Sequence, residues 1–169
     1  MIKGLEPVFL YIARFGEIDR RNVREINKTL ASDAQLLVQP AGTVSKRNPV
    51  KISDLPWNKF FIRKAIQYKR DVIPVHVQAR NSQLFYNIAS FRKIFRIKSN
   101  LEMFLLPREM FNKSGKTISI TFGEPIAYET FDESRTHLEW AQKVREYVYL
   151  LGSDNFSTAS TIPSFSEIL

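Results

Sequence analysis

His76 and His137 are the two histidines of the chain and its best candidates for a general base near neutral pH. A catalytic histidine needs an acidic side chain to orient it, and the spacing around either residue indicates no such partner. We therefore expect a structural, hydrogen-bonded role for His76 and an exposed position for His137 in the first turn of a helix. We predict no catalytic residue from these side chains.

Cysteine is absent from the 169 residues. This absence excludes disulfides, thiolate metal sites and cysteine nucleophiles, and it fits a reducing compartment. The sequence predicts no metal site and no bound cofactor.

A second candidate for chemistry is the segment QPAGTVSK, residues 39–46, which follows an apolar run. A Pro-Ala-Gly turn beyond a strand can present backbone N–H groups to an anion, with Ser45 and Lys46 as additional donors. We call this segment the 39–46 loop. The alternative is an ordinary connection between a strand and a helix.

Positive charge is concentrated in residues 46–98, which contain 13 Lys and Arg and only two acidic residues, Asp54 and Asp71. The whole chain carries a net charge of +8. Such an excess attracts anionic lipid headgroups, acidic substrates or nucleic acid, or it forms a solvated face without a partner. No apolar run approaches the length of a membrane span, so we expect no segment that crosses a bilayer.

Hydrophobic periodicity predicts the elements that must position these residues. Helices are expected at residues 22–31, 57–68 and 81–95, and from the capping-box pair Thr136 and Glu139 to Leu151. Strands are expected at residues 34–38, 72–79, 101–106 and 117–122, with Pro74 marking a strand start, an edge or a bulge. This alternation predicts one α/β domain, residues 1–151, with a mostly parallel sheet covered by helices. Residues 152–169 are rich in Ser and Thr and are expected to form a flexible tail.

Four segments resemble, in the right order, the motifs of the PlsC-type glycerolipid acyltransferases. The 39–46 loop resembles the F-P-E-G-T-x-S motif at the end of a buried strand. The other three are residues 15–21 (FGEIDRR), similar to the second motif, residues 61–65 (FIRKA), similar to F-K-x-G-A, and residues 72–75 (VIPV), similar to V-P-V or I-P-V.

The run of residues 55–76 (LPWNKFFIRKAIQYKRDVIPVH), with residues 80–93 and 108–111, resembles the haemolysin-like branch of this superfamily, which handles aminolipids or lysophospholipids. The resemblance covers roughly residues 5–151. It implies an enzyme of lipid biosynthesis, peripheral on the cytoplasmic face of the membrane, that transfers a fatty acyl group to a lysolipid or aminolipid acceptor. The donor would be a thioester of acyl-CoA or acyl carrier protein.

The resemblance also implies which residues bind the acceptor. Ala41 replaces the usual Glu of the motif and Val44 a frequent Arg, so Lys46 or Arg47 would have to supply the charge that recognises the acceptor. The expected acceptor-binding residues are Gly16, Arg20, Arg21, Pro40, Ala41, Gly42, Thr43, Ser45 and Lys46.

The family's catalytic histidine and aspartate are spaced H-x-x-x-x-D, and neither histidine here fits, because Asn81 and Gln142 stand at the aspartate positions. We therefore expect this chain to be the C-terminal, acceptor-binding portion of the family fold. A truncated product, one half of a split gene and an inactive relative all remain open. An unpaired sheet edge would then favour self-association.

Two readings from other classes compete with the enzyme. One is a non-catalytic protein that binds anionic lipid surfaces, for which Phe85, Phe91 and Phe95 interleaved with basic residues are suited. The same aromatics could equally form a core-facing stripe. The other is a basic nucleic-acid-binding module, which a pI of about 9.8 permits but no recognised motif supports.

Overall fold

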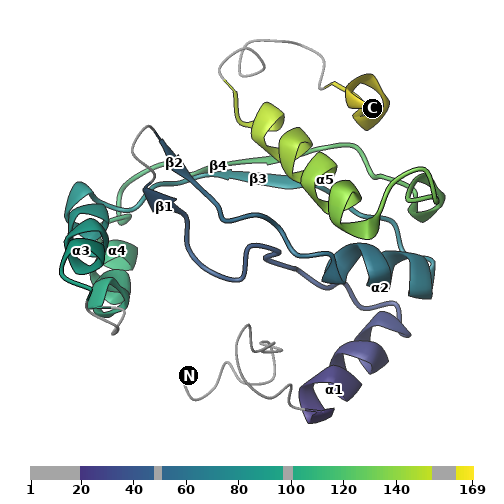
Figure 1. Ribbon diagram of the computed structural model, residues 1–169, viewed down its shortest axis with the longest axis horizontal. Coiled ribbons are helices and arrows are strands. Elements are labelled where there is room, and N and C mark those ends of the chain that lie inside the picture. Colours follow the sequence, from purple (N-terminus) through teal and green to yellow (C-terminus); the bar gives the residue numbers. More distant parts are fainter. Residues whose placement is uncertain (1–19, 48–50, 97–100, 154–162) are drawn as a thin grey trace.

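The computed structural model describes residues 20–47, 51–96, 101–153 and 163–169 (Figure 1). Its α-helices are α1 (Arg20–Leu30), α2 (Phe60–Tyr68), α3 (Gln83–Ile94), α4 (Leu106–Phe111) and α5 (His137–Leu151). Its strands are β1 (Lys46–Arg47), β2 (Ile52–Ser53), β3 (Val75–Gln78) and β4 (Ser119–Phe122). Short 3₁₀ helices are η1 (Leu101–Leu105), η2 (Tyr128–Thr130) and η3 (Phe165–Ile168).

The core lies between α5 and α2 and is completed by residues of the connecting segments and of η3, namely Ala41, Trp57, Ile126, Phe131 and Phe165 (Figure 1). The helix predicted up to Leu151 is confirmed, and its residues at spacings of three and four, Trp140, Val144, Tyr147 and Leu151, are all buried. The predicted capping box is also present: the Glu139 N–H donates to the Thr136 hydroxyl, and the Glu139 carboxylate accepts the Thr136 N–H at 2.7 Å. Local sequence therefore sets where the central helix begins and which face it buries.

The prediction of a mostly parallel sheet is not borne out in the described residues. β3 pairs antiparallel with β4, from Val75 opposite Phe122 to Gln78 opposite Ser119, and β1 pairs antiparallel with β2. The predicted effect of Pro74 is confirmed: an isolated bridge joins Val72 to Ile126, and β3 starts only after the proline. The fold consists of helices with two small antiparallel sheets.

Two predicted strands are wrong. Residues 34–38 have no regular secondary structure and pair with no strand in the described part of the chain, and Leu37 is 82% exposed. The Arg70 guanidinium holds this segment by donating to the carbonyls of Ser32 and Ala34 at 2.6 and 3.0 Å. Residues 101–106 instead form η1 and the start of α4, because a helical turn places Glu102 inside, against Arg92.

The C-terminal residues contact the core. Phe165 of η3 is buried, with its ring centroid 5.5 Å from that of Tyr147, and the Tyr147 hydroxyl donates to the Pro163 carbonyl at 2.7 Å. Residues 163–169 are thus packed on α5, whereas we expected them in a flexible tail. The domain boundary after Leu151 stays a prediction.

Candidate functional site

The 39–46 loop is a tight turn followed by unpaired backbone donors. The Gly42 N–H donates to the Gln39 carbonyl at 3.0 Å, and Gly42 has a φ of 63°, which favours glycine. Pro and Gly at the second and fourth positions are typical of the commonest β-turn. The next three N–H groups, of residues 43–45, donate to no group in the described ranges. Successive amides of this kind suit an anion.

The start of α2 anchors the loop from one side. The Pro40 carbonyl accepts from the Asn58 N–H at 3.1 Å and from the Asn58 side-chain amide at 2.5 Å. The Asn58 amide oxygen in turn accepts from the Phe60 N–H at 3.0 Å, at the N-terminus of α2. The positive end of the α2 dipole therefore adjoins the turn. Ala41 is buried in the core, so its side chain packs inward and does not face a ligand.

Asp54 anchors the loop from the other side. Its carboxylate accepts from the Ser45 hydroxyl at 2.5 Å and from the Trp57 indole N–H at 3.4 Å. Its backbone is held by α5: the Asp54 N–H donates to the Tyr149 hydroxyl at 2.9 Å, and Arg145 donates to the Asp54 carbonyl at 3.0 Å. This network directs the single hydrogen of the Ser45 hydroxyl to Asp54, so that Ser45 can accept a hydrogen bond from a ligand but does not donate one to an anion in this arrangement.

Sequence reasoning missed Asp54, Arg145 and Tyr149. A signal for Asp54 exists, since it is one of two acidic residues in a basic stretch. Arg145 lies 4.8 Å over the Tyr149 ring, at a spacing of four residues on α5, which is the spacing of helical neighbours. Their contact with Asp54 has no local signature.

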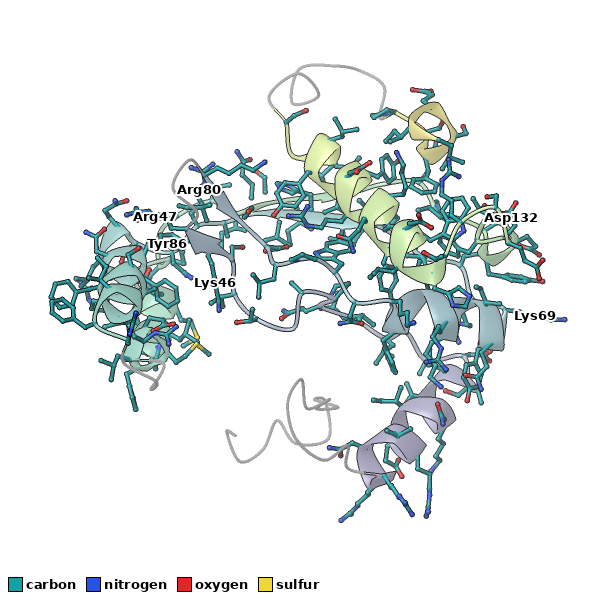
Figure 2. All side chains as sticks on the ribbon, viewed as in Figure 1. Lys46, Arg47, Lys69, Arg80, Tyr86 and Asp132 are labelled. Atoms are coloured by element: carbon teal, nitrogen blue, oxygen red, sulfur yellow. The ribbon has the colours of Figure 1, made fainter. Side chains whose placement is uncertain are left out.

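The basic end of the loop leads toward α3. Lys46 and Arg47 form β1 and are half-buried. The Arg47 guanidinium donates to the Asn87 side chain at 2.9 Å and lies 5.7 Å over the Tyr86 ring. Figure 2 shows the labelled residues Arg47, Tyr86, Arg80 and Lys46 at this end of the molecule. Arg47 therefore joins β1 to α3, whereas the Lys46 side chain makes no hydrogen bond or ion pair within the described residues.

The other predicted binding residues lie elsewhere. Arg20 and Arg21 are exposed in the first turn of α1, at the end of that helix remote from α2 in Figure 1. The structure therefore does not bring them to the loop, and Gly16 lies outside the described residues. Of the nine predicted residues, Pro40, Ala41, Gly42, Thr43, Ser45 and Lys46 belong to the 39–46 loop, and their contact with an acceptor stays a prediction.

His76 has a structural environment. It is half-buried on β3 beside the end of α5, and a Cβ added to Gly152 would lie 2.1 Å from its Cε1 atom. Burial lowers the pKa of His76 below 6.5, and the charge of Asp54 opposes that shift. His76 is thus neutral at physiological pH. His137 is exposed at the start of α5, as predicted.

Comparison with known proteins gives the family. The family model described as Acyltransferase matches residues 1–157. The chain belongs to the acyltransferase family. It is 43% identical over 150 residues to a lyso-glycine lipid O-acyltransferase of Bacteroides thetaiotaomicron, covering 89% of this chain and 55% of that protein. It is 39% identical over 150 residues to the protein so named in Phocaeicola vulgatus, covering 89% of this chain and 54% of that protein.

This acyltransferase-family chain thus spans about half the length of these two relatives. No solved structure matches it. Among the described residues, no helix combines the length and the apolar character that a membrane span requires.

Proposed function

We propose that this chain carries the acceptor-binding part of an enzyme that transfers a fatty acyl group from an acyl thioester to a hydroxyl of a lysolipid or aminolipid. The donor would be acyl-CoA or the thioester of acyl carrier protein. The family match and the names of the two relatives support the class of reaction. A lyso-glycine lipid is the acceptor that those names suggest for this chain.

One observation carries the proposal. The 39–46 loop carries the Lys46 side chain and three N–H groups, of residues 43–45, that have no partner in the described ranges, and hydrogen bonds at Pro40 and Ser45 anchor it. Donors fixed before binding cost little to organise, so they can hold a polar or anionic headgroup in a defined orientation. The apolar tail of such an acceptor then extends away from the turn.

The chemistry of transfer sets what the remaining groups must do. A base removes the proton of the acceptor hydroxyl, the oxygen attacks the thioester carbon, and the thiolate leaves from a tetrahedral oxyanion. The loop residues orient the acceptor in this scheme. We assign the base to neither histidine, because His76 packs against Gly152 and His137 is exposed in the first turn of α5.

Direct binding tests the proposal. The chain is titrated with lyso-glycine lipid below its micelle concentration, and dissociation constants are compared for wild type, Lys46→Gln and Ser45→Ala. Losing one charged or polar contact raises the dissociation constant roughly tenfold, which corresponds to about 1.4 kcal/mol. Lys28→Gln, an exposed lysine of α1, is the matched control and binds as wild type does.

The proposal fails if wild type binds the lipid no better than Lys46→Gln does. It also fails if Lys28→Gln weakens binding as much as Lys46→Gln, since this would indicate attraction by net charge alone.

A further inference from the structure

Apolar side chains are exposed over a lobe formed by α3, η1 and α4, residues 83–96 and 101–111, which we call the α3–α4 lobe. Figure 1 shows this lobe at one end of the molecule, away from α2 and α5. Phe104 is 82% exposed, Ile94 74% and Phe111 71%. Other exposed apolar residues of the lobe are Leu84, Phe91, Phe95, Leu101, Met103 and Met110. A concentration of this kind marks a surface that meets an apolar partner.

The structure separates the aromatics that the sequence could not distinguish. Phe85 and Tyr86 are buried and pack edge to face at 5.5 Å, so they form the inner side of the lobe. Phe91 and Phe95 lie outside, with ring centroids 4.3 Å apart. Phe91 and Leu101 also line a shallow cavity of about 190 Å³ between α3 and η1. The outer end of α3 and η1 therefore share one apolar surface.

The charges on the lobe have one sign. Its two acidic residues are buried: Glu102 forms a 2.9 Å ion pair with Arg92, and Glu109 accepts two hydrogen bonds from Ser82. Within the described residues from 79 to 118, every exposed charged side chain is basic, and these are Arg80, Arg96, Arg108 and Lys116. The lobe therefore combines exposed aromatics with cations and presents no carboxylate to solvent.

We propose that the α3–α4 lobe docks this protein on an anionic lipid bilayer. Its aromatic and aliphatic side chains enter the interface, and Arg96 and Arg108 of the lobe contact the phosphate groups, with Arg80 and Lys116 from the flanking segments. Aromatic residues and cations on one surface match the two layers of an anionic membrane interface, whereas a protein partner would have to match both the apolar residues and the unbroken positive charge.

The lobe also has a fixed relation to the 39–46 loop. Arg47, next to Lys46, joins β1 to α3 through Asn87 and Tyr86. Asn87 lines the same shallow cavity as Phe91 and Leu101. Docking through the lobe would therefore bring the Lys46 end of the loop toward the bilayer surface, where a lipid headgroup is found.

Vesicle flotation tests the docking surface. The full chain is mixed with vesicles of phosphatidylglycerol and phosphatidylcholine, or of phosphatidylcholine alone. We expect binding to the anionic vesicles, and we expect Phe104→Ser to weaken it roughly tenfold. Leu37→Ser is the matched control, because Leu37 has the same 82% exposure but lies outside the lobe. Arg108→Gln lowers binding at low salt, whereas Arg63→Gln on α2 does not.

Insertion is measured separately with tryptophan at the same positions. Trp57 and Trp140 are buried in the core, so their emission does not report the lobe. In Phe104→Trp, brominated lipid quenches the added emission, and in Leu37→Trp it does not. Equal quenching at both positions would overturn the proposal. A second result would also overturn the proposal: wild type does not bind vesicles but self-associates in light scattering, and Phe104→Ser abolishes this self-association. A second copy of the chain would then cover the lobe.

Discussion

Replacing Asp54 with Ala removes the carboxylate that links the 39–46 loop to the core. Two hydrogen bonds are lost, from Ser45 at 2.5 Å and from the Trp57 indole at 3.4 Å, and the buried indole N–H keeps no protein acceptor. A hydrogen bond to a charged group contributes about 1.5–3 kcal/mol, and an unsatisfied buried donor costs about 1–3 kcal/mol. We therefore expect Asp54→Ala to lower the free energy of unfolding by about 2–4 kcal/mol.

Urea denaturation followed by far-UV circular dichroism measures this loss. For a chain of this length, it corresponds to a fall in melting temperature of about 5–10 °C. Ser45→Ala alone costs about 1–2 kcal/mol, because Asp54 keeps its other partner. Asp33→Ala is the control, an exposed aspartate for which we expect a change within about 0.5 kcal/mol.

The double mutant decides whether Ser45 and Asp54 act together. If the hydrogen bond is the reason for the loss, the two changes are non-additive by about 1 kcal/mol or more. Additivity to within about 0.3 kcal/mol would refute the reasoning, because it would mean that the 2.5 Å contact contributes nothing to stability.

Three other changes test the fold around the site. Gly152 has an unstrained φ of −97°, but the methyl group that Gly152→Ala adds would clash with the His76 ring. We therefore expect Gly152→Ala to lower the free energy of unfolding by about 1–3 kcal/mol. His76→Ala relieves this loss, and a double-mutant cycle followed by urea denaturation measures the relief. Burial raises the pKa of Glu109, but hydrogen bonds from Ser82 and nearby positive charges outweigh this and hold it below 4.5. The ionised Glu109 therefore stabilises the fold above pH 4.5, and this stabilisation is lost as the pH falls through the lowered pKa. We expect the melting temperature of Glu109→Gln to fall less steeply than that of wild type as the pH is lowered below 4.5. An equally steep fall in both proteins would contradict the assignment. Thr136→Ala removes the cap of α5 and costs about 1 kcal/mol by thermal denaturation, with an unchanged melting temperature as the contrary result.

The helices could be predicted because their signals are local. Thr136, Glu139 and the buried stripe of α5 lie within one helix, and the spacing of three and four residues alone identifies them. The same holds for α2 and α3, whose observed bounds lie inside the predicted ranges.

The sheet could not be predicted, because an apolar run does not specify its partner. Residues 34–38 have the composition of a buried strand, yet Leu37 is exposed and the Arg70 side chain takes the place of a neighbouring strand in holding the backbone. The direction of β3 relative to β4 likewise depends on a pairing between segments more than 40 residues apart.

The candidate site was found only in part. Pro40 and Gly42 mark the turn in the sequence, because proline and glycine two positions apart are typical of a turn. The support for the turn is long-range: Tyr149 reaches Asp54 across 95 residues, and no periodicity connects them. Arg20 and Arg21 were included by resemblance, and the structure places them on a helix start away from the loop.

Replacing the aligned 150-residue segment of the Bacteroides thetaiotaomicron relative with the matching segment of this chain tests the central claim most directly. We expect the chimera to transfer a labelled acyl group to lyso-glycine lipid, and we expect Lys46→Gln in the chimera to raise the KM for the lipid several-fold, while Lys28→Gln leaves it unchanged. A folded chimera without transferase activity, or one whose KM for the lipid does not respond to Lys46→Gln, would contradict the assignment of the 39–46 loop to the acceptor.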